Sequence, residues 1–249
     1  MTAELIVDAR NAVGECPVWV PEENALYWVD IPNGGLQRWS AATGHIDAWK
    51  APQMLACIAR TDAGNWVAGM ESGFFQLTAH NDGSLDTTPL AEVAHPRADM
   101  RLNDGRCDRQ GRFWAGTMVE QATADTAASG SLYRRDQKGC QQMLSGLRIP
   151  NALCWNHDSS LMYHADSPLQ QINRYRFNPI TGELGAAVFH VHVDGEGIEV
   201  AIKGEGGPDR AFLASLVKLT AGIALGGKST EGQQTDQAGG CGGQGQSFQ

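Results

Sequence analysis

A strand-pair pattern that recurs four times constrains the fold of this chain more than any other feature of its sequence. Each copy has an aromatic-rich strand, a gap and a second strand, and three of the copies end in a turn. Equivalent positions in successive copies are 38, 47 and 49 residues apart. The aromatic-rich strands lie at 24–30, 64–69, 111–116 and 160–165, and their partners at 35–39, 73–77, 130–134 and 171–175. A period of this size with paired strands is typical of β-propeller blades.

The recurrence predicts an all-β fold, a propeller of which about four blades are recognisable. Each blade would be a small twisted sheet that cannot bury both faces alone and therefore stacks on its neighbours around a central axis. A β-sandwich with loosely similar strands is the alternative, but the same order of strands in every copy favours the propeller. The recurring aromatic side chains are then core residues rather than a platform on which ligands stack.

The composition changes near residue 195. All seven Trp and all four Tyr precede it, and the last 55 residues contain 14 of the 30 Gly but only two aromatic residues, Phe212 and Phe248. We therefore divide the chain into propeller blades at 1–197 and an irregular tail at 198–249. Within the tail, residues 208–225 have apolar side chains at helical spacing, and the glycine-rich end is predicted to be disordered.

Charge and cysteine content exclude several classes of protein. The formal net charge of −9 argues against a nucleic-acid partner, because phosphate binding needs a basic face. No run of 18 apolar residues is present, so we expect no membrane span. The first 13 residues lack the pattern of a signal peptide, and the six cysteines match no zinc-binding spacing. We therefore expect reduced thiols and a cytoplasmic location.

Seven segments, taken together and in order, are specific enough to suggest a family. They lie at 14–19 (GECPVW), 26–31 (LYWVDI), 101–105 (RLNDG), 107–118 (CDRQGRFWAGTM), 149–153 (IPNAL), 163–168 (YHADSP) and 175–184 (YRFNPITGEL). This set resembles the SMP-30/gluconolactonase/LRE family, which includes regucalcin and the sugar lactonases. The resemblance implies a six-bladed propeller with one divalent metal ion (Ca, Zn, Mn or Mg) in its central channel. It also implies a small-molecule substrate, a sugar lactone such as gluconolactone, which the protein would hydrolyse.

The resemblance also implies roles for individual residues. Glu15 and Asn151 would be metal ligands, and Arg101, Asn103 and Glu120 would line the substrate site. An oxygen-only ligand set with little charge suits Ca²⁺, Mg²⁺ or Mn²⁺ better than a Cys/His zinc cage does. Without the resemblance, the same Glu would be a surface carboxylate and the two Asn would be turn formers.

The sequence departs from the family pattern after residue 197. Relatives carry a G-x-P-D-G segment whose aspartate is the third metal ligand and the general base, and here Val200 stands near that place. Glu199 and Asp209 are the nearest carboxylates, and the catalytic base remains unassigned. We therefore expect a carboxylic-ester hydrolase of impaired activity. The alternatives are a non-enzymatic regucalcin-like calcium-binding protein and a non-functional truncated family member, produced for example by a frameshift.

Overall fold

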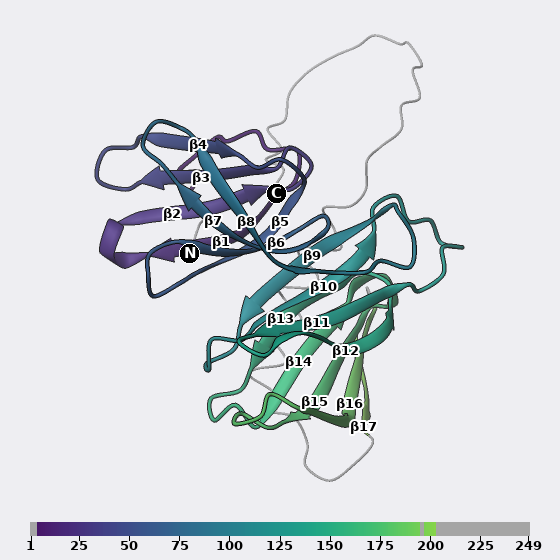
Figure 1. The fold of residues 1–249 in the computed structure, drawn as a ribbon. Helices are drawn as coiled ribbons and strands as arrows, with labels where there is room; N and C mark the ends of the chain where they lie inside the picture. Colours follow the sequence, from purple (N-terminus) through teal and green to yellow (C-terminus); the bar gives the residue numbers. More distant parts are fainter. Residues whose placement is uncertain (1–3, 195–196, 203–249) are drawn as a thin grey trace, which may run out of the picture. The chain divides into compact units, whose positions relative to one another are not determined.

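The computed structural model describes residues 4–194 and 197–202, which form antiparallel β-sheets joined by turns (Figure 1). The strands of each sheet pair in chain order. The first sheet consists of β1 (Gly14–Val20), β2 (Ala25–Asp30), β3 (Gly35–Ser40) and β4 (Ile46–Lys50). The second consists of β5 (Leu55–Arg60), β6 (Trp66–Met70), β7 (Gly73–Ala79) and β8 (Leu85–Glu92).

The remaining described strands form two more sheets. The third sheet consists of β9 (Met100–Cys107), β10 (Phe113–Val119), β11 (Gly130–Asp136) and β12 (Gly139–Leu147). The fourth consists of β13 (Pro150–Trp155), β14 (Leu161–Asp166), β15 (Gln171–Phe177), β16 (Leu184–Asp194) and β17 (Gly197–Ile202). Short 3₁₀ turns, η1 (Pro21–Glu23) and η2 (Ser167–Leu169), follow β1 and β14.

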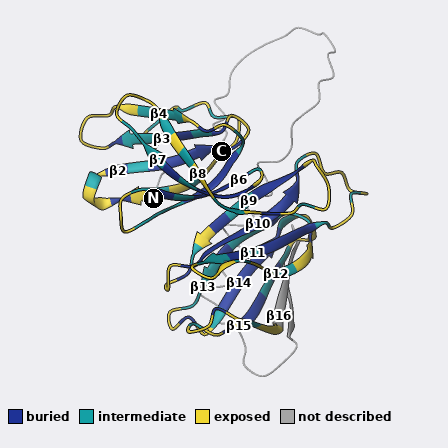
Figure 2. Ribbon diagram, viewed as in Figure 1, coloured by how far each residue is buried: buried dark blue, intermediate teal, exposed yellow. Residues whose placement is uncertain are grey.

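The all-β fold and its blades are confirmed. The recurring strand pair of the sequence corresponds to the second and third strands of each sheet, and most residues of the second strands β2, β6, β10 and β14 are buried. Figure 2 shows this burial along β10, all of whose residues are buried. The first and fourth strands fall outside the recurring pattern of the sequence, although β4 alternates exposed and half-buried residues along its whole length.

Aromatic side chains join each sheet to the next. The pairs and the distances between their ring centroids are Tyr27–Trp66 at 4.6 Å, Phe74–Phe113 at 5.9 Å and Trp114–Phe177 at 5.9 Å. Edge or tilted contacts of this kind add about 0.5–1.5 kcal/mol to the burial of each ring. The first strands of successive sheets also lie side by side, β1 against β5, β5 against β9 and β9 against β13. The recurring aromatic residues are therefore core, as the sequence predicted.

The fourth sheet continues beyond the end of the recognised repeat. β17 pairs antiparallel with β16, so a strand occupies the beginning of the segment that the sequence suggested to be irregular. Ile198, Val200 and Ile202 alternate with other residues, which is a strand pattern that the loss of aromatic residues concealed. The helix predicted at 208–225 and the glycine-rich end lie outside the described residues. Among the described residues, no helix is long and apolar enough to cross a membrane.

Candidate metal and substrate site

An irregularity in the first strand of each sheet positions the predicted site residues. The paired register shifts in all four, and such bulges bend a strand and redirect its side chains. The shifts fall between Glu15 and Val18 in β1, Leu55 and Cys57 in β5, Leu102 and Gly105 in β9, and Asn151 and Cys154 in β13. Cys16 and Ala152, which directly follow the two predicted metal ligands, have φ angles of +51° and +55°.

Two aspartates fix the segments that lead into β1 and β13. Asp30, at the end of β2, accepts hydrogen bonds from the backbone amides of residues 12 and 13, at 3.3 and 3.0 Å. Asp166, at the end of β14, accepts equivalent bonds from the amides of residues 148 and 149, both at 2.9 Å. Each predicted metal ligand, Glu15 and Asn151, therefore lies two residues after a backbone amide that a buried aspartate holds in place.

Four of the predicted site residues form one hydrogen-bonded row. The guanidinium of Arg101, which is buried, forms an ion pair with Glu120 and donates through Nη1 to Oδ1 of Asn103 at 3.0 Å. Nδ2 of Asn103 donates to Oδ1 of Asn151 at 3.0 Å. Nδ2 of Asn151 donates to the hydroxyl of Ser167 at 2.7 Å. The structure thus brings Arg101, Asn103, Glu120 and Asn151 together, although they come from different strands and sheets.

Asp104 connects this row to Glu15. Its carboxylate accepts a hydrogen bond from the backbone amide of Ala152 at 2.7 Å, and burial raises its pKa. Partial loss of hydration raises the pKa of Glu15, and the negative charge of Asp104 raises it further, while the cation of Arg101 opposes the shift. A cation bound beside Glu15 and Asp104 would offset the repulsion that Asp104 exerts on the charged form of Glu15.

Glu15 itself lies at the border of the row. It has no hydrogen bond to Asn151, and it lines a groove of about 360 Å³ with Leu26 and Trp28 of the first sheet. Its side chain remains exposed. The predicted pairing of Glu15 with Asn151 as metal ligands therefore stays a prediction, linked through the charge of Asp104.

The donors at this site suit a hard divalent cation. They are the carboxylates of Glu15 and Asp104 and the side-chain amides of Asn103 and Asn151, all of which offer oxygen. Among the described residues, no three His, Cys, Asp or Glu side chains form a group that could hold a metal. A cation here would thus depend on amide oxygens, and an amide can rotate to present its oxygen instead of its nitrogen.

The nearby thiols do not belong to the candidate ligand set. Burial raises the pKa of Cys16 and of Cys154 to about 12, so both stay protonated at neutral pH. A protonated thiol is a poor metal ligand and a poor nucleophile.

Two further points concern residues that the sequence named or missed. Ser167, which holds the amide of Asn151, was not recognised as a site residue, although it lies within the family-like segment at 163–168. Glu199 lies on β17, of which the backbone alone is described, and Asp209 lies outside the described residues.

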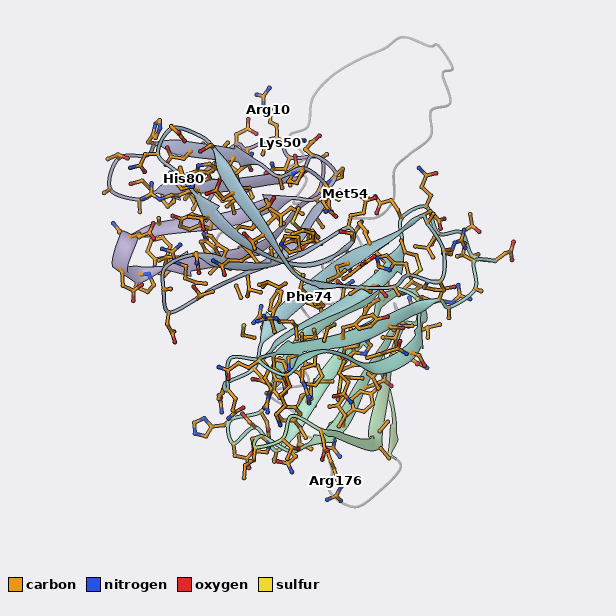
Figure 3. All side chains as sticks on the ribbon, in the orientation of Figure 1. Arg10, Lys50, Met54, Phe74, His80 and Arg176 are labelled. Carbon is orange, nitrogen blue, oxygen red and sulfur yellow. The ribbon has the colours of Figure 1, made fainter. Side chains whose placement is uncertain are left out.

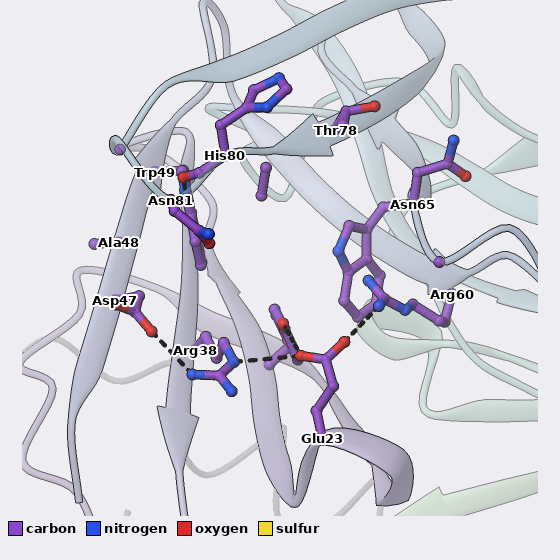
Figure 4. A pocket seen from close by; sticks show the side chains of 15 residues that line it. Glu23, Arg38, Asp47, Ala48, Trp49, Arg60, Asn65, Thr78, His80 and Asn81 are labelled. Atoms are coloured by element: carbon purple, nitrogen blue, oxygen red, sulfur yellow. Dashed lines mark hydrogen bonds and ion pairs between the residues drawn. The ribbon is translucent and has the colours of Figure 1, made fainter. Parts of the chain in front are cut away.

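A larger cavity, of about 580 Å³, lies between the first and second sheets, at the opposite end of β1 from Glu15 (Figure 4). Its charged groups neutralise one another, since Arg38 pairs with Glu23 and Asp47, and Arg60 pairs with Glu23. None of the predicted site residues lines it. This cavity and the candidate site are therefore separate features of the molecule.

Comparison with known proteins agrees with the resemblance seen in the sequence. The pattern of the SMP-30/Gluconolactonase/LRE-like region matches residues 13–216. The chain is 34% identical over 175 residues to 6-deoxy-6-sulfogluconolactonase of Pseudomonas putida, which covers 70% of this chain and 58% of that protein. It is 35% identical over 175 residues to L-arabinolactonase of Azospirillum brasilense, which covers 68% of this chain and 56% of that protein. The chain thus spans less than two thirds of the length of these relatives.

A solved structure extends the likeness to the fold. The chain superposes on regucalcin of Agrobacterium tumefaciens, a calcium-binding protein, with a TM-score of 0.65 and 25% sequence identity. The superposition covers 81% of this chain and 71% of that one. The described sheets therefore share the fold of that protein over most of their length.

Proposed function

The chain belongs to the SMP-30/Gluconolactonase/LRE-like family, and from this premise we propose that it is a sugar lactonase that uses one divalent metal ion. Relatives that are named as lactonases support this class of reaction, which is the hydrolysis of a cyclic carboxylic ester. Because the chain spans only part of those relatives, the proposal extends to the class of substrate and not to an individual lactone.

The hydrogen-bonded row carries the proposal. Arg101 is held by Glu120 on one side and by Asn103 on the other, so its guanidinium keeps one orientation. A fixed cation with free N–H groups beside an amide can bind the ring oxygens and hydroxyls of a sugar lactone. Preorganisation of this kind lowers the entropic cost of placing the substrate's carbonyl.

The metal would be held by Glu15 and Asn151, with Asn103 and Asp104 beside them. When bound, a divalent cation polarises a carbonyl group and lowers the pKa of a coordinated water. Asn103 would position the lactone, because its amide lies between the cation-binding side and Arg101. Glu120 would keep the guanidinium of Arg101 aimed at the substrate, because the ion pair between them fixes its orientation.

We further propose that this activity is weak. The aspartate that serves relatives as third ligand and base has no counterpart at Val200, and a base contributes about 10²- to 10⁴-fold to such reactions. The second candidate function is calcium binding without turnover. The likeness to a calcium-binding regucalcin and the oxygen-only donor set favour it.

Lactone hydrolysis releases a proton, so a pH-indicator assay measures it directly. We expect turnover of glucono-δ-lactone above the spontaneous rate with Mn²⁺, Zn²⁺, Mg²⁺ or Ca²⁺, and its loss after chelation. Thermal stabilisation by Ca²⁺ without turnover would instead support the calcium-binding function, because a ligand of the native state raises its stability. Neither turnover nor stabilisation by any of the four ions would refute both.

A further inference from the structure

A small pocket beside the hydrogen-bonded row has no role in the function proposed so far. It measures about 230 Å³ and lies between the β10–β11 connection and the start of β13. Ala122, Thr123 and Thr126 line it from the connection, and Arg148 and Ile149 line it from the other side. Its volume is below the roughly 300–1,000 Å³ of sites that enclose a whole ligand, so it suits one substituent of a larger molecule.

The pocket adjoins the candidate substrate site along three segments of the chain. Val119, in its wall, immediately precedes Glu120, and Ile149 lies two residues before Asn151. Pro168, also in its wall, follows the serine whose hydroxyl holds the amide of Asn151. Neighbouring residues of the same three segments thus form the pocket and the row, and we take a sugar bound at the row to extend one end toward the pocket.

Arg148 gives the pocket a positive charge that the protein leaves uncompensated. Nη1 of its guanidinium donates to the backbone oxygen of Ala124 at 3.1 Å, and its own backbone amide is held by Asp166 at 2.9 Å. Within the described ranges, no carboxylate lies at ion-pair distance from it, whereas Arg101 nearby pairs with Glu120. A guanidinium has five N–H donors, so most of them remain available to a ligand.

The threonines of the connection add polar groups to the same wall. The hydroxyls of Thr123 and Thr126 lie 3.2 Å apart, and the hydroxyl of Thr126 accepts a hydrogen bond from the backbone amide of Thr123 at 2.8 Å. This turn holds the connection, and the contact of Ala124 with Arg148 ties it to the start of β13. The carbonyl group of Ala124 thus positions the guanidinium of Arg148 at the pocket wall.

We propose that Arg148 is a specificity residue that binds an anionic substituent, such as a phosphate or sulfonate, at the end of the sugar farthest from the lactone carbonyl. A charged oxyanion and the planar guanidinium form short, strong hydrogen bonds, and the pocket has room for such a group. This inference rests on the proposed function, because it assumes a sugar at the hydrogen-bonded row.

Binding of open-chain aldonates tests it without turnover. Gluconate and 6-phosphogluconate are titrated by calorimetry into the full chain and into Arg148→Gln and Arg148→Lys. We expect 6-phosphogluconate to bind to the native chain at least about 10-fold more tightly than gluconate, which is the gain from one charge-assisted hydrogen bond. This preference should be lost in Arg148→Gln and partly kept in Arg148→Lys. Arg176→Gln is the matched control, because this arginine is exposed and points away from the sheets (Figure 3).

Equal binding of the two aldonates to the native chain, or an unchanged preference in Arg148→Gln with an unchanged melting temperature, would overturn the inference. Inorganic phosphate alone is titrated as a further arm. If it binds as tightly as 6-phosphogluconate, the inference is also overturned, because the pocket would then bind a free anion without any contribution from the sugar. Failure of the lactonase proposal shows separately, as absence of turnover in the pH-indicator assay.

Discussion

At the scale of single residues, the site depends on side chains whose orientation is fixed by their neighbours. Asn103 illustrates this, because its amide accepts from Arg101 and donates to Asn151. Its sequence context, Asn-Asp-Gly, indicates a turn former, yet in the structure it lies within β9 at a bulge. The family-like motifs grouped Asn103 with Asn151, which the local sequence alone could not do, since their contact joins residues 48 positions apart. The role of Asn103 in substrate binding stays a prediction.

Replacement of Asn103 by Ala should lower kcat/KM for glucono-δ-lactone by about 10- to 100-fold, because one link of the row and its substrate contact are lost. The melting temperature should change little, since Asn103 is only half-buried. Asn81→Ala, at an exposed position in the β7–β8 turn, is the control and should keep full activity. Equal activity of the two variants would contradict the assigned role.

His164 is a second residue whose surroundings have a measurable consequence. It is completely buried on β14, and neither ring nitrogen has a hydrogen-bond partner within the described structure. Burial lowers its pKa to about 4 from the usual 6.5, and the charge of Asp166 opposes this shift. Between these two pH values the unfolded chain binds a proton that the folded chain does not.

The free energy of unfolding should therefore decrease as the pH is lowered from 6.5 to 4, by about 1.4 kcal/mol per unit at most. Replacement of His164 by Leu should reduce this slope, whereas replacement of the exposed His157 by Gln should leave it unchanged. Urea unfolding at several pH values measures both. An identical slope in His164→Leu and the native chain would show that other groups cause the acid sensitivity.

At the scale of elements, adjacent sheets are joined by specific contacts as well as by apolar packing. Glu23, in η1 after β1, accepts hydrogen bonds from the hydroxyl of Tyr27 at 2.5 Å and from Nε of Arg38 at 3.4 Å, and it forms an ion pair with Arg60 on β5 (Figure 4). Arg60 also lies 4.9 Å from the ring centroid of Trp66. One carboxylate thus connects the first sheet to the second.

Replacement of Glu23 by Gln should destabilise the protein by about 1–2 kcal/mol, because two partly buried arginines lose their shared partner. Glu22→Gln removes the same charge from the neighbouring exposed position and should change stability by less than about 0.5 kcal/mol. Urea midpoints of the two variants make the comparison. Similar midpoints would mean that the contact contributes only as a surface ion pair does.

A glycine controls the approach of the third sheet to the fourth. A Cβ atom at Gly116 on β10 would lie 2.2 Å from Cγ of Pro150, and Pro150 is the first residue of β13. Gly116→Ala should therefore cost about 1–3 kcal/mol of stability and also weaken activity, since Asn151 follows that proline. Gly35→Ala, whose Cβ would meet nothing closer than 3.4 Å, is the control. A stable, active Gly116→Ala variant would show that the two sheets can separate without harm.

At the scale of the whole molecule, the recurrence of strand pairs predicted the fold, which no single motif could predict. Four recurring strand pairs were enough to predict blades, since each pair supplies the buried centre of a sheet. The first strands escaped prediction because bulges interrupt their alternation, and these strands carry the site. β17 escaped it because its alternation is short and follows the last aromatic strand. The row of site residues was predictable only through the ordered family motifs, because its contacts join distant positions.

The bulges have a consequence for how such a molecule can change. The last paired residue before the bulge is Leu55 in β5, and this side chain is wholly buried. The same position holds Glu15 in β1 and Asn151 in β13. The same backbone device thus tolerates an apolar, an acidic or an amide side chain without losing its sheet. New chemistry can accordingly arise by single substitutions at one recurrent position, while the aromatic packing that holds neighbouring modules together stays untouched.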